Sequence, residues 1–114
     1  MSVSPQIRAN FEAAKSTDHT GVGAAYAVLG AVSSFPTQMI FISSSLDTSA
    51  WLSIDGSTDM ILILASSSVS LNVSGNKQGT GKLAFAAGTQ FYIKEGPDGA
   101  PSSGDLSLTM IYGR

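Results

Sequence analysis

The segment SVSLNV, residues 68–73, alternates polar and apolar residues without interruption. Successive side chains of a β-strand point to opposite faces, so Val69, Leu71 and Val73 are expected on one face and the serines and the asparagine on the other. This alternation is typical of a strand that covers a core on one side and meets water on the other. The C-terminal segment repeats the pattern at Leu106, Leu108, Met110 and Tyr112.

Short apolar stretches continue outward from this segment in both directions. From Gly21 onward, clusters of Gly, Pro, Asp and Ser separate them at intervals of about eight to twelve residues, which is typical of β-sandwiches and barrels. We expect strands at residues 24–29, 38–44, 50–54, 59–64, 68–73, 82–86, 89–94 and 105–112. The sequence therefore predicts an all-β fold, a jelly-roll-like or Greek-key β-sandwich of about eight strands.

The first twenty residues differ from the rest, although 114 residues form a single domain with one core. Ile7, Phe11 and Ala14 recur at helical spacing, and a polar STDHTG segment follows them. Either a short helix or an extended arm fits this pattern, and a helix of this length is marginal alone. We expect residues 1–20 to form an N-terminal arm that contacts another subunit through Ile7 and Phe11, while residues 21–114 form the β-sandwich and fold without it.

Two predicted strands, MIFI at residues 39–42 and MILIL at residues 60–64, are apolar on both faces. A sandwich covers one face of a strand, so the second face needs a further cover, and a neighbouring subunit is the expected one. Met39, Phe41 and Met60 are the interface candidates. Trp51 is predicted to face outward and is a further interface candidate; the alternative is that a loop or the N-terminal arm covers it.

Composition excludes several functional classes. Charged residues make up 12% of the chain and the net charge is −2, so the sequence has no basic footprint for nucleic acid. No apolar stretch is long enough for a membrane-spanning helix, and the N-terminus lacks the order of an export signal. Without cysteine, thiol catalysis and disulfides are excluded. We expect a protein made in the cytoplasm that binds neither nucleic acid nor membrane.

The stretch GNKQGTGKL, residues 75–83, has the glycines and lysine of a phosphate-binding loop. Such a loop needs a following helix whose N-terminal amides hold the anion, whereas predicted strands flank this one. Five residues separate Gly75 from Gly81 where the motif has four, and Leu83 stands where a Ser or Thr would bind magnesium. We interpret the stretch as a hairpin loop and expect no nucleotide, other cofactor or small-molecule substrate.

The candidate catalytic and metal-binding residues have simpler interpretations. The single histidine lies in the polar N-terminal segment, and the two acidic residues of the KEGPDGAP turn are expected to be solvated. Three aspartates suggest calcium, but their spacing lacks the regular ligands of a calcium loop. We therefore expect no catalytic residues, no metal site and no enzymatic activity. The histidine is His19, the two acidic residues of the turn are Glu95 and Asp98, and the three aspartates are Asp47, Asp55 and Asp59.

Four stretches taken in order carry a resemblance to a known class of proteins. They are TGVGAAYAVLG at residues 20–30, QMIFISSSLDTSAWLSIDGSTDM at 38–60, AAGTQFYIKEG at 86–96 and PSSGDLSLTMIYGR at 101–114. Together they resemble small β-rich virion proteins of tailed bacteriophages, with a departure at Met60, where a polar residue often follows the hairpin aspartate. The resemblance implies a role in particle architecture and no catalytic residues.

Three functions follow as hypotheses. The first is a capsid decoration or cement protein on a phage head, which bridges capsomers and has itself, as a dimer or trimer, and a major capsid protein as partners. The second is a tail or head-to-tail appendage subunit that anchors a fibre or binds a host surface. The third is a carbohydrate-binding β-sandwich module that uses Trp51. The first two place the protein on a virion.

Overall fold

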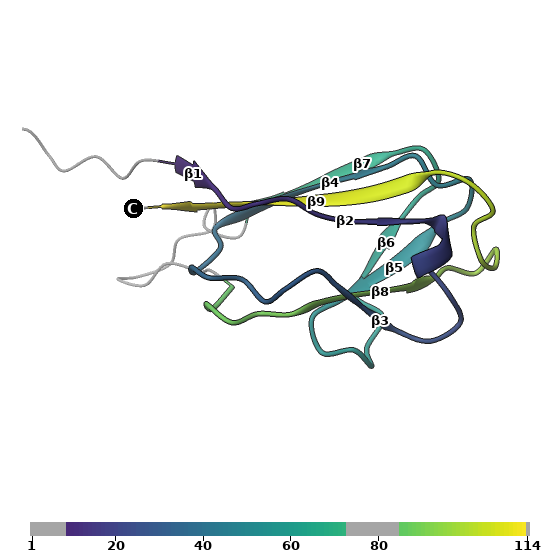
Figure 1. Cartoon of the computed structure of the whole chain (residues 1–114), viewed down its shortest axis with the longest axis horizontal. Coiled ribbons are helices and arrows are strands. Elements are labelled where there is room, and N and C mark those ends of the chain that lie inside the picture. Colours follow the sequence, from purple (N-terminus) through teal and green to yellow (C-terminus); the bar gives the residue numbers. More distant parts are fainter. Residues whose placement is uncertain (1–8, 73–84, 114) are drawn as a thin grey trace, which may run out of the picture.

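Two antiparallel β-sheets pack face to face and form the whole of the described fold (Figure 1). A computed structural model provides the structure and describes residues 9–72 and 85–113. One sheet has five strands and the other has four. The predicted all-β sandwich is confirmed.

The described elements are nine strands and one turn of 3₁₀ helix. Their bounds are β1 Ala9–Phe11, β2 Lys15–Asp18, η1 His19–Gly21, β3 Ala27–Leu29, β4 Met39–Ser44, β5 Ala50–Ser53, β6 Ile61–Ile63, β7 Ser68–Asn72, β8 Phe91–Glu95 and β9 Asp105–Gly113.

The strand order is that of a jelly roll. Strands β2 to β9 form two sheets of four, β2-β9-β4-β7 and β3-β8-β5-β6, and most connections pass from one sheet to the other. Because β1 and β2 lie one after the other along the same edge of β9, they act as one interrupted strand. The predicted jelly-roll-like class, with about eight strands, therefore agrees with the observed topology.

The core lies between the two sheets. It consists of the inward-facing residues of strands in which inward and outward residues alternate. In β9 the predicted alternation is confirmed, because Leu106, Leu108 and Met110 are fully buried. In β7, Val69 and Leu71 pack against the same core. Burying one such side chain contributes about 1.5–3 kcal/mol. The remaining core residues are Val22, Leu29, Ile40, Ile42, Leu46, Ala50, Leu52, Ile63, Phe91 and Ile93.

Most predicted strands occur, several of them shorter than expected. The predicted strand at 24–29 is limited to 27–29, and that at 59–64 to 61–63. Of the predicted strand at 82–86, only residues 85 and 86 are described, and Phe85 forms an isolated bridge to Thr37. The glycine-rich stretch 75–83 and Ile7 lie outside the described residues.

The N-terminal segment is extended, which is one of the two forms that its sequence pattern allows. Residues 9–11 and 15–18 are strands paired with β9, so the helical spacing of Phe11 and Ala14 does not produce a helix. The reason is that β9 has an edge whose backbone groups need partners, and a strand supplies them where a marginal helix does not. The predicted boundary after residue 20 therefore follows a strand that belongs to the sheet. That the sandwich folds without this segment stays a prediction.

Between β1 and β2 the chain makes a β-bulge. Phe11 is opposite Ile111 and Lys15 is opposite Leu108. The chain therefore has one more residue between Phe11 and Lys15 than β9 has between Leu108 and Ile111. The bulge explains why the edge strand is divided in two. No helix in the described ranges is long and apolar enough to cross a membrane.

Proline substitutions in β2 test whether this segment contributes to the stability of the domain. His19 N donates to Gly104 O, so in the antiparallel register the amide of Thr17 faces β9 and that of Ser16 faces away. We expect Thr17→Pro to lower the free energy of unfolding by about 1–3 kcal/mol, because it removes a ladder donor. The matched change Ser16→Pro is expected to cost less. Urea unfolding measures both, and equal stability of the two variants would identify residues 9–18 as a separable arm.

Candidate interaction surfaces

Three predicted interface residues lie together on the outer face of the five-stranded sheet. Phe11 on β1 is opposite Ile111 on β9, and Ile111 is opposite Met39 on β4. Phe11, Ile111 and Met39 therefore form one row across three strands. Phe41 follows two residues along β4 on the same face. Phe11 is 67% exposed and Phe41 is 43% exposed. This apolar face is the kind of surface that protein contacts cover.

Sequence reasoning missed Ile111. The prediction assigned β9 by its inward residues, and Ile111 lies between two of them, Met110 and Tyr112. The signal was present, because an isoleucine there breaks an outward series that otherwise consists of Ser107 and Thr109. Only the register of β9 with β1 and β4 shows that it connects Phe11 to Met39.

The other end of the same face is rich in hydroxyl groups. Ser68, Ser43, Ser107 and Ser16 lie opposite one another across β7, β4, β9 and β2. Part of this row lines a shallow hollow of about 560 Å³ that also includes Asp18 and Asp105. The residues that line the hollow include no aromatic side chain, so a sugar would find hydroxyl partners there but no ring to stack on.

Trp51 and Met60 belong to the other sheet. Trp51 on β5 is half-buried, and its neighbours across the strands are Lys94 and Leu62. The N-terminal strands lie in the five-stranded sheet, so the sheet that holds Trp51 is not the one they extend. Met60 is 42% exposed and comes directly before β6, an edge strand. Neither residue therefore joins the row of Phe11 and Met39.

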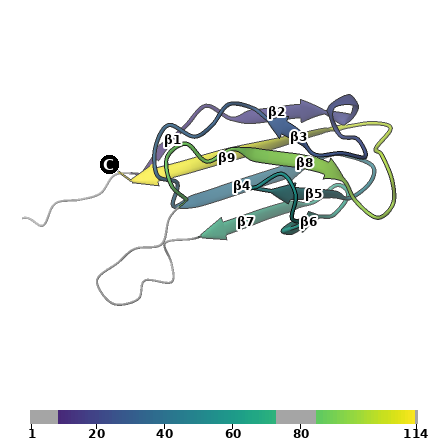
Figure 2. The same ribbon diagram turned by 90° about the horizontal axis from the view of Figure 1, so that it is seen from below.

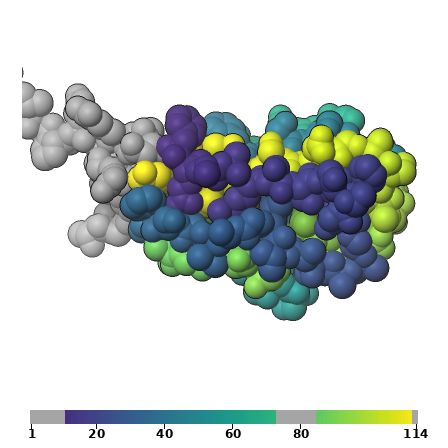
Figure 3. All heavy atoms as spheres, in the orientation of Figure 1, coloured from purple at the N-terminus to yellow at the C-terminus, as the bar shows by residue number. Residues whose placement is uncertain are grey.

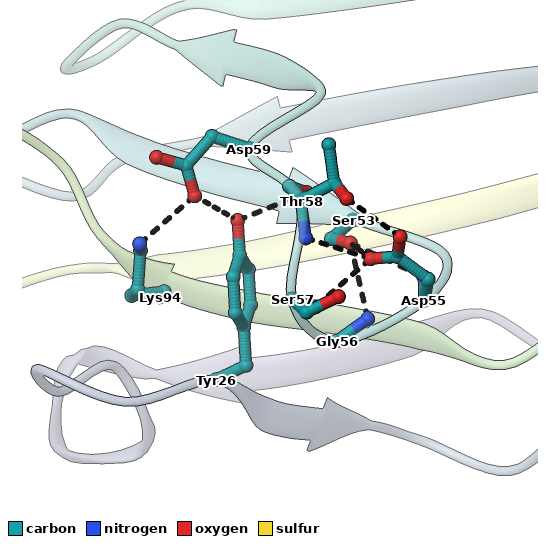
Figure 4. Close-up of polar contacts among 8 residues, drawn as sticks. All are labelled: Tyr26, Ser53, Asp55, Gly56, Ser57, Thr58, Asp59 and Lys94. Atoms are coloured by element: carbon teal, nitrogen blue, oxygen red, sulfur yellow. Dashed lines mark hydrogen bonds and ion pairs between the residues drawn. The ribbon is translucent and has the colours of Figure 1, made fainter.

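The hairpin between β5 and β6 is held by the Asp55 carboxylate. Its oxygens accept hydrogen bonds from the amides of Ser57 and Thr58, at 2.8 Å each, and from the hydroxyls of Thr58 and Ser53 (Figure 4). The two amides are the main reason that the pKa of Asp55 is well below its usual value. Gly56 supplies the positive φ of 77° that the turn requires, as its position in the sequence predicts.

The same hairpin is tied to the far side of its sheet by Asp59. This carboxylate accepts a hydrogen bond from the Tyr26 hydroxyl and forms an ion pair with Lys94 at 2.8 Å, and Lys94 also lies 4.7 Å from the centre of the Tyr26 ring (Figure 4). The bond from Lys94 holds the pKa of Asp59 below its usual value, and desolvation raises the pKa of Tyr26. The cluster fixes the hairpin over the outer face of the sheet.

The remaining candidate residues do not converge on a site. Asp47 accepts a hydrogen bond from the amide of Ser102 at 2.8 Å, so each of the three aspartates that suggested calcium serves a separate local contact. His19 lies in η1, and Glu95 and Asp98 lie at the end of β8 and in the turn after it. Within the described ranges, no group of three or more His, Asp or Glu residues is placed to hold a metal.

The ionised state of Asp55 predicts a pH dependence of stability. Its pKa is lower in the folded chain than its unfolded value of about 3.9, so its contribution is complete above that value and is lost as the pH falls below it. We expect Asp55→Asn to melt at a lower temperature than the wild type from pH 7 to about pH 5. The difference should shrink below about pH 4. A difference in melting temperature that is the same at pH 7 and pH 2 would contradict this explanation of the turn.

Comparison with known proteins finds similarity to solved structures. No family model and no curated protein matches the chain. Two chains of solved structures match, and one belongs to the structure described as "Bacillus endospore appendages form a novel family of disulfide-linked pili". The TM-score is 0.45 and the identity 16%, over 98% of this chain and 94% of that chain. Those pili are disulfide-linked, whereas this chain contains no cysteine. The match does not name a virion protein, so the predicted place on a virion stays a prediction.

Proposed function

We propose that this chain is a structural subunit that assembles with copies of itself through an open sheet edge. The open edge consists of residues 60–72, which contain β6 and β7, the last strands of the four- and five-stranded sheets. Figure 2 shows β6 and β7 along the same side of the molecule, opposite β2. Among the described strands, β6 and β7 therefore each have a sheet neighbour on one side only.

The observation that carries the proposal is the direction of the backbone groups in β7. Ser44 N donates to Ser67 O at 2.8 Å, and in this antiparallel register the backbone groups of Val69 and Leu71 face β4. The backbone groups of Ser68 and Ser70 lie in the plane of the sheet and point away from β4. A row of outward amides and carbonyls is a template for another strand, and copies of the same chain are one source of such a strand.

The open edge lacks the charges and prolines that protect many sheet edges against pairing. Residues 60–72 contain no charged residue and no proline, and Met60 and Leu64 are 42% and 60% exposed. Natural sheet edges that must stay single carry lysines, prolines or bulges. The opposite edge of the five-stranded sheet has two of these, the bulge between β1 and β2 and the inward Lys15. This contrast supports the open edge as the place where copies join.

Pairing of like strands favours an appendage subunit over a decoration protein. In an appendage the main contact is between copies, whereas decoration of a phage head requires contact with a different protein, the major capsid protein. The apolar face with Phe11, Met39 and Phe41 lies on the outer side of the five-stranded sheet, where Phe41 is opposite Ser70 of β7, and it is a surface for contact with a different protein in either assembly. We accordingly propose that the protein is a subunit of a tail or another appendage.

Ser70→Pro tests the open edge. Proline removes the outward amide and leaves the β4 ladder intact, so we expect the free energy of unfolding to change by less than about 1 kcal/mol. Self-association is expected to weaken at least about tenfold, because a strand can no longer be added there. Sedimentation velocity over a range of protein concentrations measures the association.

Ser70→Ala is the matched control, since it removes the same hydroxyl and keeps the amide. We expect it to assemble like the wild type. A wild-type chain that stays monomeric at high concentration would contradict the proposal and would favour a protein that needs a different partner, as a capsid decoration protein does. Assembly of Ser70→Pro that equals the wild type would place the contact elsewhere.

A further inference from the structure

A groove runs along the side of the molecule opposite the open edge. It lies between the β1–β2 segment and the loop that follows β3, has a volume of about 340 Å³, and is lined mainly by apolar side chains. Figure 3 looks onto this side, where the purple residues of β1 and β2 lie beside the blue residues that follow β3. The residues that line the groove include Phe11, Glu12, Lys15, Val32, Phe35 and Tyr112.

The walls of the groove are fixed by contacts between its two sides. The Glu12 carboxylate accepts hydrogen bonds from the amides of Ser34 and Phe35, at 2.8 and 2.9 Å, which ties the bulge to the loop. The Phe35 ring stacks on Tyr112, with the ring centres 4.1 Å apart. Because both sides are anchored, the groove is a built feature and does not depend on the position of a free loop.

Lys15 places a positive charge in the groove. The residue is 9% exposed, and its aliphatic stem passes beneath Gly30, where a Cβ would come within 2.8 Å of the stem. Its Nζ atom is not among the buried polar atoms that lack a partner, so the stem is covered while the ammonium reaches the solvent of the groove. Within the described part of the chain Lys15 makes no ion pair. The groove therefore contains a cation that a carboxylate of another molecule can reach.

Two apolar side chains at the groove are exposed. Phe11 is 67% exposed and Val32 is 49% exposed, on opposite sides of the groove. The groove thus has exposed apolar side chains, a carboxylate that uses one oxygen for the loop amides, and a cation that makes no ion pair with any described residue. A surface with both charges and apolar residues is complementary to itself, because a two-fold axis sets residue i against j and j against i.

We infer that two copies dock at this groove about a two-fold axis, with Lys15 of each copy paired to Glu12 of the partner subunit and Phe11 packed between them. The inward lysine and the bulge oppose the addition of a strand at this edge, so the contact is made by side chains. This inference rests on the proposed self-assembly and adds a second contact on the opposite side. A copy joined at both sides extends a chain, whereas either contact alone gives a dimer.

The test uses the full chain with Ser70→Pro, in which the open edge is blocked and the groove is intact. We expect this variant to be a dimer by sedimentation equilibrium. Adding Lys15→Met, which keeps the stem and removes the charge, should weaken the dimer at least about tenfold, and Glu12→Gln should do the same. Glutamine retains an oxygen for the two loop amides. Circular dichroism and thermal melting establish that each variant is folded.

Mixing the two variants distinguishes a two-fold contact from any other. Each variant alone has lost both ion pairs, but a mixed dimer regains one, between the intact Glu12 of the first copy and the intact Lys15 of the second. The mixed dimer should therefore be tighter than either dimer alone. Phe11→Ala should also weaken association, and Phe41→Ala, at an exposed phenylalanine of the same sheet but outside the groove, should not.

The outcomes separate this inference from the proposed function. A Ser70→Pro chain that is monomeric, or a mixture that associates no more tightly than its components, overturns the groove contact. If the Lys15 and Glu12 variants behave as expected but Ser70→Pro alone leaves wild-type assembly unchanged, the open-edge proposal fails and the groove contact stands.

Discussion

The antiparallel pairing of β9 with its neighbours on both sides is the constraint on which the rest of the structure depends. It pairs with β4 along one side and with β1 and β2 along the other. Leu106, Leu108 and Met110 then point into the core, and Ser107 and Ile111 point outward. A slip of one residue would exchange the two faces and bring Ser107 and Thr109 inside, at the cost of the buried leucines. The register of β9 therefore sets both the core and the composition of the outer face.

The two edges of the five-stranded sheet are built differently, and this difference carries the functional argument. At β7 the outward backbone groups have no neighbouring strand among the described residues, and residues 60–72 contain no charge. At β2 the bulge and the inward Lys15 oppose a further strand. One edge is therefore suited to backbone pairing, and the other to a contact between side chains. Both need little long-range electrostatic attraction, in keeping with a chain in which 12% of the residues are charged.

The three aspartates that suggest a calcium site are accounted for by local hydrogen bonds and an ion pair. Asp55 and Asp47 accept amide hydrogen bonds from nearby turns, and Asp59 is paired with Lys94. The donors to each carboxylate lower its pKa, and for Asp55 and Asp47 these donors include backbone amides. Short polar side chains form such turns whatever the function of the protein, so an aspartate in a turn is weak evidence for a metal site. The structure is more informative about the interface candidates, because a contact surface depends on which residues share a face of the sheet.

The sequence by itself determined the fold class and the faces of the main strands. Alternation with a period of two is a property of neighbouring residues, so Val69, Leu71 and the inward residues of β9 could be assigned without any tertiary information. The glycine of the β5–β6 turn was predictable for the same local reason. Only the tertiary structure decided that residues 9–11 and 15–18 are strands, that Ile111 connects Phe11 to Met39, and that Lys15 and Glu12 line one groove. These relations depend on the register between strands far apart in the chain, which no local pattern specifies.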